Sequence, residues 1–467
     1  MGKTRIEKDS LGPREIPAEV YYGIQTDRAL ENFPISGLRE HPVFINAFIM
    51  LKKAAAVANM EAGGLAKDKG EAIVKACDEV LAGKLRDQFV VDVFQMGAGT
   101  SFNMNCNEVI ANRANEILGG GLGTYDKVNP NDHVNFGQST NDTIPTAIRL
   151  SALIQLRDSL HKPLVELEES FLAKGREFDR VLKSARTHLQ DAVPIRLGQE
   201  FKAYGEAIKR CHQFLAKARE SLLEIGIGGS AAGTGLNTAP GYREKIIKHL
   251  SEMTGFALKP SADMREAMQS QRPVAEVSSA LRNLALEVTR IANDLRLLSS
   301  GPTTGFAEID LPAVAPGSSI MPGKVNPSIL EMTNMVCYQI MGCDLAIAMA
   351  VQAGQLELNV MMPLMAFNLN FMIHIFGNCL KQLNHYCVKG ITAKEAQCRR
   401  FAEGSMGLAT ALNPYIGYAR AAEVAKEALH SGKTIIEIIR EKGILKEDEI
   451  ARIMDPIKMT EPGIAGK

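Results

Sequence analysis

The apolar residues in the central part of the chain recur with the spacing of long α-helices. Across residues 274–298 they follow one another at alternating intervals of three and four, which is the period of one face of a helix. Pro273 precedes this run, and proline is favoured in the first turn of a helix. The pattern predicts one helix of about seven turns that packs at a shallow crossing angle against similar helices. Residues 204–222 repeat the same spacing and predict a second such helix.

Two further segments are apolar on nearly every side. Residues 328–353 carry few charged side chains, and residues 364–380 have Asn368, Asn370, His374 and Asn378 as their polar exceptions. A helix that is apolar all round must be buried on every side. We therefore expect both helices at the centre of a bundle or in an interface between subunits, with His374 as a hydrogen-bonded core residue.

These patterns indicate a mostly helical chain, for which we expect three domains. A mostly helical N-terminal domain is expected over residues 1–141, followed by a bundle of long helices over residues 142–395. Beyond that point the apolar spacing shortens, which predicts a small C-terminal helical domain over residues 396–467. A length of 467 residues is consistent with two or three domains around a large core.

Charge and composition exclude several classes of function. Lys and Arg together number 53, as do Asp and Glu, and Trp is absent, which argues against nucleic acid or a membrane surface as a partner. The apolar run at residues 340–351 is too short to span a membrane and includes Asp344. The first residues show no apolar signal core, so we expect a cytoplasmic protein. The cysteines and histidines form neither a Cys-x-x-Cys nor a His-x-x-x-His pattern, so no metal site and no cofactor is predicted.

Four stretches concentrate small hydroxyl and amide side chains. They are residues 97–105, 129–142, 186–191 and 317–327. Taken singly, such clusters mostly mark turns and helix N-termini. Taken together, they provide what a dicarboxylate substrate needs, namely several neutral hydrogen-bond donors, a fixed cation and few competing carboxylates.

The last of these stretches is the most informative. It reads Gly-Ser-Ser-Ile-Met-Pro-Gly-Lys-Val-Asn-Pro over residues 317–327, and it places two hydroxyls, one ammonium and one amide between two apolar helical segments. Its glycines and prolines keep it from joining either helix. A polar loop between helices is a typical location for catalytic residues.

In this order the four stretches resemble those of the aspartase/fumarase superfamily, and the resemblance extends from Arg5 to about Gly466. Residues 11–17, 22–28, 233–237 and 356–360 also resemble segments of that family. Membership implies an all-α homotetramer in which the central helices form a twenty-helix core. It also implies active sites that each take residues from three subunits.

The family reversibly eliminates an amine, water or a similar group from a succinyl substrate, usually giving fumarate. By resemblance, Ser318 is the base that takes a proton from C3, while Lys324 and Asn326 hold the carboxylate that becomes an aci-dianion. A second subunit would bind the substrate through Thr187 and His188. A third would supply the remaining substrate-binding residues, Thr100, Ser101, Ser139, Thr140 and Asn141. His188 is the alternative base, because imidazole accepts protons near neutral pH.

Details of the motifs favour one branch of the family. Gly-Ala-Gly-Thr-Ser at residues 97–101, Asn-Pro-Asn-Asp at 129–132 and Ser-Thr-Asn-Asp at 139–142 resemble aspartases more than class II fumarases. The resemblance therefore implies a carbon-nitrogen lyase that removes ammonia from L-aspartate. A class II fumarate hydratase, or a lyase for another succinyl compound, is the alternative.

Three residues depart from the family pattern. Thr303 stands where arginine is usual, Met362 where aspartases carry glutamate, and Met96 where glycine is usual. The loss of the arginine and the glutamate is either a coupled change that leaves the site intact or the mark of a different substrate. A catalytically silent relative, of the kind found as a lens crystallin, is another alternative, and the complete set of polar residues argues against it.

Overall fold

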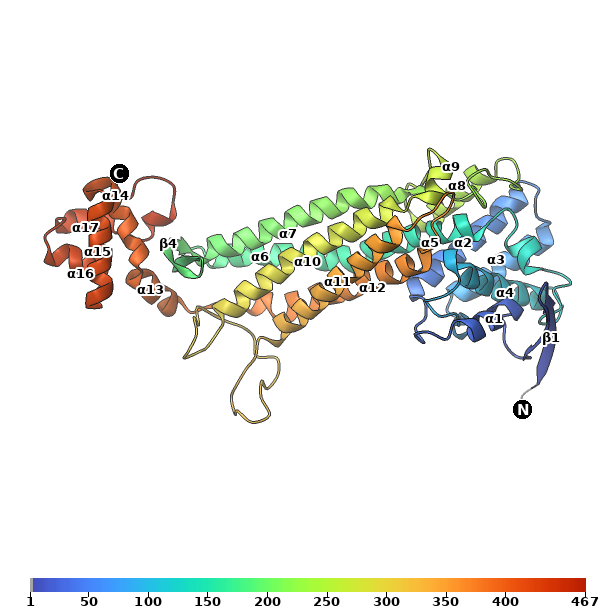
Figure 1. Ribbon diagram of the computed structural model, residues 1–467, viewed down its shortest axis with the longest axis horizontal. Helices are drawn as coiled ribbons and strands as arrows, with labels where there is room; N and C mark the ends of the chain where they lie inside the picture. Colours follow the sequence, from blue (N-terminus) through green and yellow to red (C-terminus); the bar gives the residue numbers. More distant parts are fainter. Residues whose placement is uncertain (1–2) are drawn as a thin grey trace. The chain divides into compact units, whose positions relative to one another are not determined.

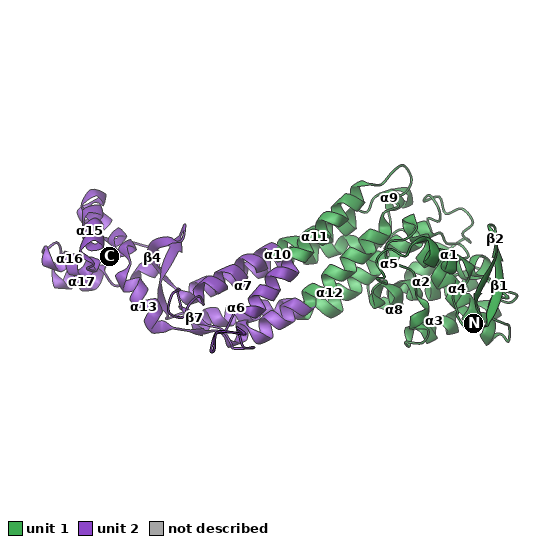
Figure 2. Ribbon diagram, turned by 60° about the horizontal axis from the view of Figure 1, so that its bottom comes forward, with its two compact units in different colours: residues 1–162, 213–285, 338–377 green, residues 163–212, 286–337, 378–467 purple. Residues whose placement is uncertain are grey.

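The computed structural model describes residues 3–467 and is built mainly of helices (Figure 1), so the predicted all-α class is confirmed. The chain divides into two compact units, each made of three segments (Figure 2). Unit 1 contains residues 1–162, 213–285 and 338–377, and unit 2 contains residues 163–212, 286–337 and 378–467. This division follows packing within the chain, and the three predicted domain ranges stay a prediction.

Five long helices run from one unit into the other. They are α6 (His161–Glu177), α7 (Leu197–Glu220), α10 (Arg272–Leu298), α11 (Ser328–Gln352) and α12 (Met362–Tyr386). The predicted helix over residues 274–298 is α10, with Pro273 in its first turn. Its apolar positions are buried, as the spacing predicted, with Val277, Leu284 and Leu295 at 0% exposure.

Unit 1 is organised around α2 (Pro42–Glu61), which packs on α3 (Lys67–Leu81), α5 (Thr140–Gln155) and α8 (Tyr242–Thr254). The start of α2 is well defined, because Pro42 occupies its first position and the His41 ring accepts the Val43 N–H. Phe44 and Phe48 of α2 meet Phe102 of α4 (Thr100–Ile117), with both ring centroids 5.3 Å from that of Phe102. Helix α4 in turn packs on α3 and α1 (Ile24–Asn32).

Short strands complete the outer parts of unit 1. The hairpin of β1 (Thr4–Asp9) and β2 (Gly12–Pro17) is antiparallel, with Asp9 paired to Gly12. β5 (Glu224–Ile225) and β6 (Lys259–Pro260) form a two-residue parallel pair that precedes α9 (Met264–Gln269). These strands join loops and build no larger sheet.

Unit 2 carries two more antiparallel pairs and the C-terminal helices. β3 (Leu182–Thr187) pairs with β4 (Gln190–Arg196), and β7 (Ile309–Asp310) with β8 (Thr392–Ala393). The helices that follow are α13 (Glu395–Gly404), α14 (Asn413–Ile416), α15 (Tyr418–Ser431), α16 (Ile435–Glu441) and α17 (Glu447–Ile453). They enclose an apolar core of their own, which includes Leu412, Ile435 and Ile439 at 0% exposure.

Two helices, α2 and α11, are long and apolar enough to cross a membrane by length and composition alone, although no such segment was expected. The most apolar window of α2 is 67% buried inside the protein, as a core helix would be, whereas that of α11 is 33% buried. The exposed residues of α11 include Met335, Tyr338, Leu345 and Met349. The expected burial of α11 on every side is therefore not met within one chain, because part of this face has no neighbour there.

His374 also differs from expectation. It lies on an exposed part of α12 rather than in the core, and its ring centroid is 4.9 Å from that of His41. Asn370, another polar residue of the same apolar segment, is fully buried and accepts a hydrogen bond from Gln155 at 2.6 Å. Helical spacing assigned both residues to one apolar segment, but they face different surroundings.

Candidate active site

The first predicted stretch forms the start of α4 in unit 1. Gly99, in the left-handed region with φ +89°, precedes the helix, and a Cβ there would lie 2.9 Å from Ile144 Cδ1. Glycine is therefore required by both conformation and space. The turn places Thr100, half-buried, and Ser101, buried, at the N-terminus of α4, where the helix dipole favours an anion.

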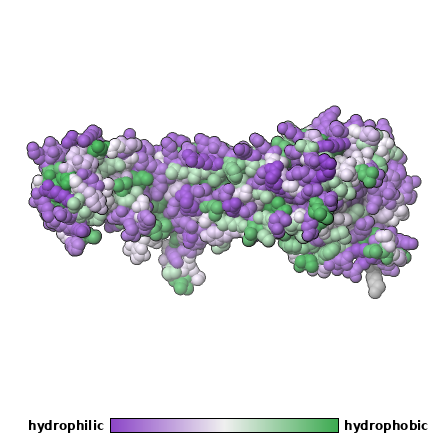
Figure 3. All heavy atoms as spheres, turned by 45° about the horizontal axis from the view of Figure 1, so that its top comes forward, coloured by the Kyte–Doolittle hydropathy of each residue, from purple (hydrophilic) through white to green (hydrophobic). Residues whose placement is uncertain are grey.

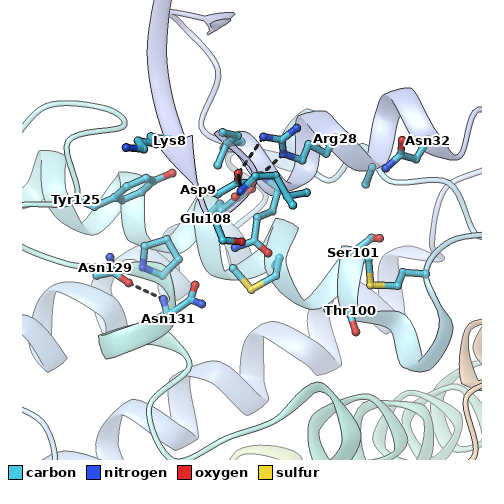
Figure 4. A pocket seen from close by; sticks show the side chains of 18 of the residues that line it. Lys8, Asp9, Arg28, Asn32, Thr100, Ser101, Glu108, Tyr125, Asn129 and Asn131 are labelled. Atoms are coloured by element: carbon cyan, nitrogen blue, oxygen red, sulfur yellow. Dashed lines mark hydrogen bonds and ion pairs between the residues drawn. The ribbon is translucent and has the colours of Figure 1, made fainter. Parts of the chain in front are cut away.

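A cavity of about 550 Å³ opens over these two residues (Figure 4). Thr100 and Ser101 line it together with Asn129, Asn131 and Met96. The Asn129 Oδ1 atom accepts the N–H of Asn131 at 2.8 Å, so this amide caps the turn that carries it. On another side Arg28 is held by both carboxylate oxygens of Asp9, at 2.8 and 2.9 Å. Met96, which stands where the family usually has glycine, thus lines this cavity.

The second stretch ends in a capping box at the start of α5. The Ser139 hydroxyl accepts the Asn141 N–H at 3.2 Å, and Asp142 Oδ1 accepts the Ser139 N–H at 2.9 Å. The other Asp142 oxygen accepts the N–H groups of Gly228 and Ser230. Asp142 is fully buried, and burial raises its pKa to about 6 although three N–H groups favour the carboxylate.

Thr140 lies within this box and is itself positioned by a side chain. The Nδ2 atom of Asn103 donates a hydrogen bond to Thr140 Oγ1 at 3.1 Å, and the Asn141 amide donates to Ala231 O at 2.8 Å. We call Asn103, Ser139, Thr140, Asn141 and Asp142 the Thr140 cluster. Its predicted substrate-binding groups are fixed before any ligand binds, because each belongs to a hydrogen-bonded turn.

The third stretch is the tip of the β3–β4 hairpin in unit 2. Thr187 pairs with Gln190 across a two-residue turn formed by His188 and Leu189, with φ values of +57° and +58°. Such a turn usually contains Asn and Gly, because positive φ is costly for other residues. Thr187 and His188 are exposed, and strain of this kind is common at functional positions.

Arg186 fixes the base of this tip. Its guanidinium donates to Glu308 Oε2 at 2.9 Å and stacks on the rings of Phe306 and Phe401, at 4.2 and 5.3 Å. Glu308 is fully buried, and Lys183 of β3 lies 3.6 Å from the same oxygen. The hairpin that carries Thr187 and His188 is therefore held by a buried ion cluster.

The fourth stretch is a loop in unit 2 that is hydrogen-bonded mainly to itself. Gly317 N–H donates to Lys324 O, and the Asn326 amide donates to Gly317 O, both at 2.7 Å. The Ser318 hydroxyl accepts the N–H groups of Ile320 and Met321 at 3.2 and 2.9 Å. Lys324 is exposed, whereas Ser318 and Asn326 are half-buried. Two converging amide N–H groups stabilise negative charge on an oxygen.

The predicted residues thus form separate groups. Unit 1 contains Thr100, Ser101 and the Thr140 cluster, and unit 2 contains the hairpin tip and the 317–327 loop. Two of the residues that depart from the family pattern also lie in different units. Met362 is fully buried in unit 1, and Thr303 is exposed in unit 2. Among the residues that the structure describes, no cluster of His, Cys, Asp or Glu is suited to hold a metal ion.

Sequence reasoning missed the residues that support the site. Asp142 had a signal, because Ser-x-x-Asp is a capping-box pattern, but it was read only as part of a motif. Asn103 and Glu308 have no such signal in the sequence. Asn103 lies 37 residues from its partner Thr140, and Glu308 lies 122 residues from its partner Arg186. Contacts of this kind become visible only in the folded chain.

Comparison with known proteins agrees with the motifs. The family model described as Lyase matches residues 12–342, and the model for the fumarase C C-terminus matches residues 408–461. An aspartate ammonia-lyase of Bacillus subtilis is 49% identical over 99% of this chain and 97% of its own length.

Two solved structures extend this likeness to the fold. The fumarate lyase:delta crystallin of Brucella melitensis, bound to cobalt, is 49% identical over 98% of this chain and 100% of its own, with a TM-score of 0.94. A class II fumarase from Schistosoma mansoni is 35% identical over 98% of this chain and 99% of its own, with a TM-score of 0.96. On this evidence the chain belongs to the lyase family of aspartases and fumarases, the aspartase/fumarase superfamily.

Proposed function

We propose that this chain is an aspartate ammonia-lyase, a carbon-nitrogen lyase that reversibly converts L-aspartate to fumarate and ammonia. The observation that carries the proposal is the 49% identity to an aspartate ammonia-lyase over 99% of the chain. The class II fumarase that shares the fold is 35% identical. Of the residues that distinguish the motifs from those of fumarases, Asn129 lines the cavity in unit 1 and Thr140 accepts a hydrogen bond from Asn103. A small dicarboxylate suits this set of neutral donors.

Ser318 is the proposed base. After its own hydroxyl proton has passed to water, the Oγ atom takes the proton from C3 of aspartate as an alkoxide, and the N–H groups of Ile320 and Met321 stabilise that alkoxide before the transfer. Removing this proton leaves two negative charges on the adjacent carboxylate. Once the loop closes, the Lys324 ammonium offsets one of them and the neutral Asn326 amide stabilises the developing charge by donating a hydrogen bond. The C–N bond then breaks, and its electron pair leaves with the ammonium group as neutral ammonia.

We also propose a homotetramer whose active sites each combine three subunits. One feature of the chain supports this assembly. The apolar face of α11 is exposed at Met335, Tyr338, Leu345 and Met349, whereas the face drawn in Figure 3 shows apolar residues scattered among polar ones. An exposed apolar patch of this kind marks an interface.

The substrate is tested by an ultraviolet assay for fumarate with L-aspartate and L-malate side by side. We expect kcat/KM for aspartate to be well above that for malate. Faster turnover of malate would promote the fumarate hydratase alternative. Turnover of neither would indicate another succinyl substrate, with Thr303 and Met362 as the residues to reverse first.

Shared sites are tested by mixing two inactive variants. Ser318→Ala and His188→Ala would each lack one residue of every site, and unfolding and refolding them together would give mixed tetramers. Some sites then receive wild-type copies of both residues from different subunits, so activity should partly return. Mixed tetramers that stay as inactive as either parent would contradict a site built from three subunits.

A further inference from the structure

A buried lysine lies close to the Thr140 cluster, and the proposed reaction makes no use of it. Lys52 of α2 is 0% exposed, and its ammonium donates to Asn135 Oδ1 at 2.9 Å and Gln138 Oε1 at 3.0 Å. Both acceptors are neutral amides. Burial lowers the pKa of Lys52 to about 7, because an ammonium is poorly stabilised in the interior. A lysine at this position is therefore costly for folding, which points to a role beyond packing.

The hydrogen bonds of Lys52 determine how the neighbouring amides are oriented. Lys52 donates through Nζ, so Asn135 turns its Oδ1 atom toward it. The same oxygen accepts the Nδ2 groups of Asn107 at 3.2 Å and of Asn103 at 3.3 Å. Asn135 Nδ2 meanwhile donates to Gln138 O. Because the Asn135 Oδ1 atom is an acceptor, Asn103 must point its Nδ2 group, a donor, toward it.

The orientation of Asn103 then determines the role of Thr140. The second hydrogen on Asn103 Nδ2 is donated to Thr140 Oγ1 at 3.1 Å. Thr140 thus accepts from the protein, and its own hydroxyl hydrogen is left to be donated to another acceptor. A substrate carboxylate has only acceptors, so it requires Thr140 in this state.

We propose that Lys52 is a positioning residue for substrate binding, which acts through Asn135 and Asn103 to keep the Thr140 hydroxyl a donor toward a substrate carboxylate. The proposal rests on the proposed function, since it takes Thr140 as a substrate contact. It assigns Lys52 no contact with the substrate.

The structure offers a matched pair of variants for the test. Asn103 and Asn107 are one turn apart on α4, 2% and 0% exposed, and both donate to Asn135 Oδ1. Of the two, Asn103 alone is hydrogen-bonded to Thr140 in the described structure. Asn103→Ala is expected to raise KM for L-aspartate about tenfold with a smaller change in kcat, the effect of one lost hydrogen bond in binding. Asn107→Ala should lose similar stability but keep KM within about twofold.

Lys52→Met tests the first link, because methionine has a similar length and no donor. It should raise KM as Asn103→Ala does, and the double variant should add little, since the two residues act through one chain of contacts. If Lys52→Met fails to fold, Asn135→Asp and Asn135→Leu replace it. The leucine removes the acceptor for Lys52 and Asn103 and should raise KM. The aspartate keeps that acceptor and loses only the hydrogen bond to Gln138 O, so it should raise KM less.

Equal KM changes for Asn103→Ala and Asn107→Ala, no change in either, or a wild-type KM in Lys52→Met would overturn the proposal. The proposed function is judged separately, by turnover of L-aspartate in the wild type. Without such turnover that function fails, and the variants are compared by calorimetric binding of succinate, which requires no reaction. A weaker affinity for succinate in both Lys52→Met and Asn103→Ala than in Asn107→Ala would still support the role of Lys52, and equal affinities would still overturn it.

Discussion

The Thr140 cluster in unit 1 and the 317–327 loop in unit 2 both carry residues that we propose as substrate contacts, but they are built differently. In the cluster, Thr140 and Asp142 are buried, and their bonds reach residues far along the chain. In the loop, the Ser318 hydroxyl and the Asn326 amide bond to residues of the loop itself. Lys324 extends into solvent.

This difference suits two different roles, substrate binding in the cluster and proton transfer in the loop. Groups that only bind a carboxylate benefit from being fixed in advance, because no entropy is then lost on binding. A base and a charge-stabilising pair must exclude water as charge develops, which a closing loop achieves. A substitution in the loop should therefore change chemistry without changing stability, and a substitution in the cluster should change both.

The largest expected effect is that of Ser318→Ala. Loss of the base should lower kcat by roughly 10²–10⁴-fold, while the denaturation midpoint and the assembly stay unchanged, because Ser318 supports no core. Steady-state assays and thermal unfolding measure both quantities. Ser319→Ala, at the exposed neighbouring hydroxyl, is the matched control and should retain activity. If Ser318→Ala keeps more than about a tenth of kcat, His188 becomes the base.

Asp142→Ala applies the same kind of truncation to the buried cluster. It removes the acceptor for the N–H groups of Ser139, Gly228 and Ser230, and should cost about 2–4 kcal/mol of stability together with substrate affinity. Urea unfolding and KM measurements test this. Asp158→Ala, at an exposed carboxylate, should change neither. Wild-type stability in Asp142→Ala would contradict the expectation that substitutions in the Thr140 cluster, unlike those in the 317–327 loop, change stability.

Two buried glutamates of unit 1 differ in their hydrogen-bond partners, and this difference can be examined through pH. Glu108 accepts the N–H groups of Gly23, Gln25 and Thr26, and burial raises its pKa to about 7. Glu40 has no partner for Oε2 in the described structure, and burial raises its pKa to about 8. Both groups prefer to be protonated inside the protein, but Glu108 alone has N–H groups that would oppose an amide.

The pH dependence of stability follows from the raised pKa of Glu40. Between its ordinary value of 4.5 and about 8 the folded state binds more protons than the unfolded state, so Glu40 favours folding below this range and loses that contribution as pH rises. Glu40→Gln should therefore gain about 1–3 kcal/mol relative to wild type between pH 5 and pH 8. Urea unfolding at both values measures this, and an unchanged difference would contradict it. Glu108→Gln, the control, should be destabilising at both values.

The smallest effect is expected at the hairpin tip of unit 2. Leu189 has φ +58° and is 65% exposed, so glycine would relieve strain and lose little packing. Leu189→Gly should stabilise the protein by roughly 0.5–1 kcal/mol, after the greater entropy of the unfolded glycine chain is taken into account. Gln190→Gly, at the first residue of β4, should instead be destabilising. A loss of stability in Leu189→Gly would show that its side chain has contacts that this chain alone does not contain.

Much of the fold followed from the sequence by local rules. The spacing over residues 274–298 predicted α10 nearly to the residue, because a helix buries one face with a fixed period. The polar stretches were also predicted as turns, and the chain forms them at helix starts and at the hairpin tip. Local hydrogen bonding determines such turns, so nearby residues are sufficient to predict them.

Only the tertiary structure decides which side chains of a helix are buried, because this depends on contacts with residues distant in sequence. The two lysines at positions 52 and 53 are neighbours in one apolar helix, yet Lys52 is fully buried against Asn135 while Lys53 pairs with Asp78 near the surface. Likewise His374 and Asn370 lie on one helix with opposite exposure. The sequence determines which side chains share a helix, but which of them is buried depends on the neighbours that folding brings to each face.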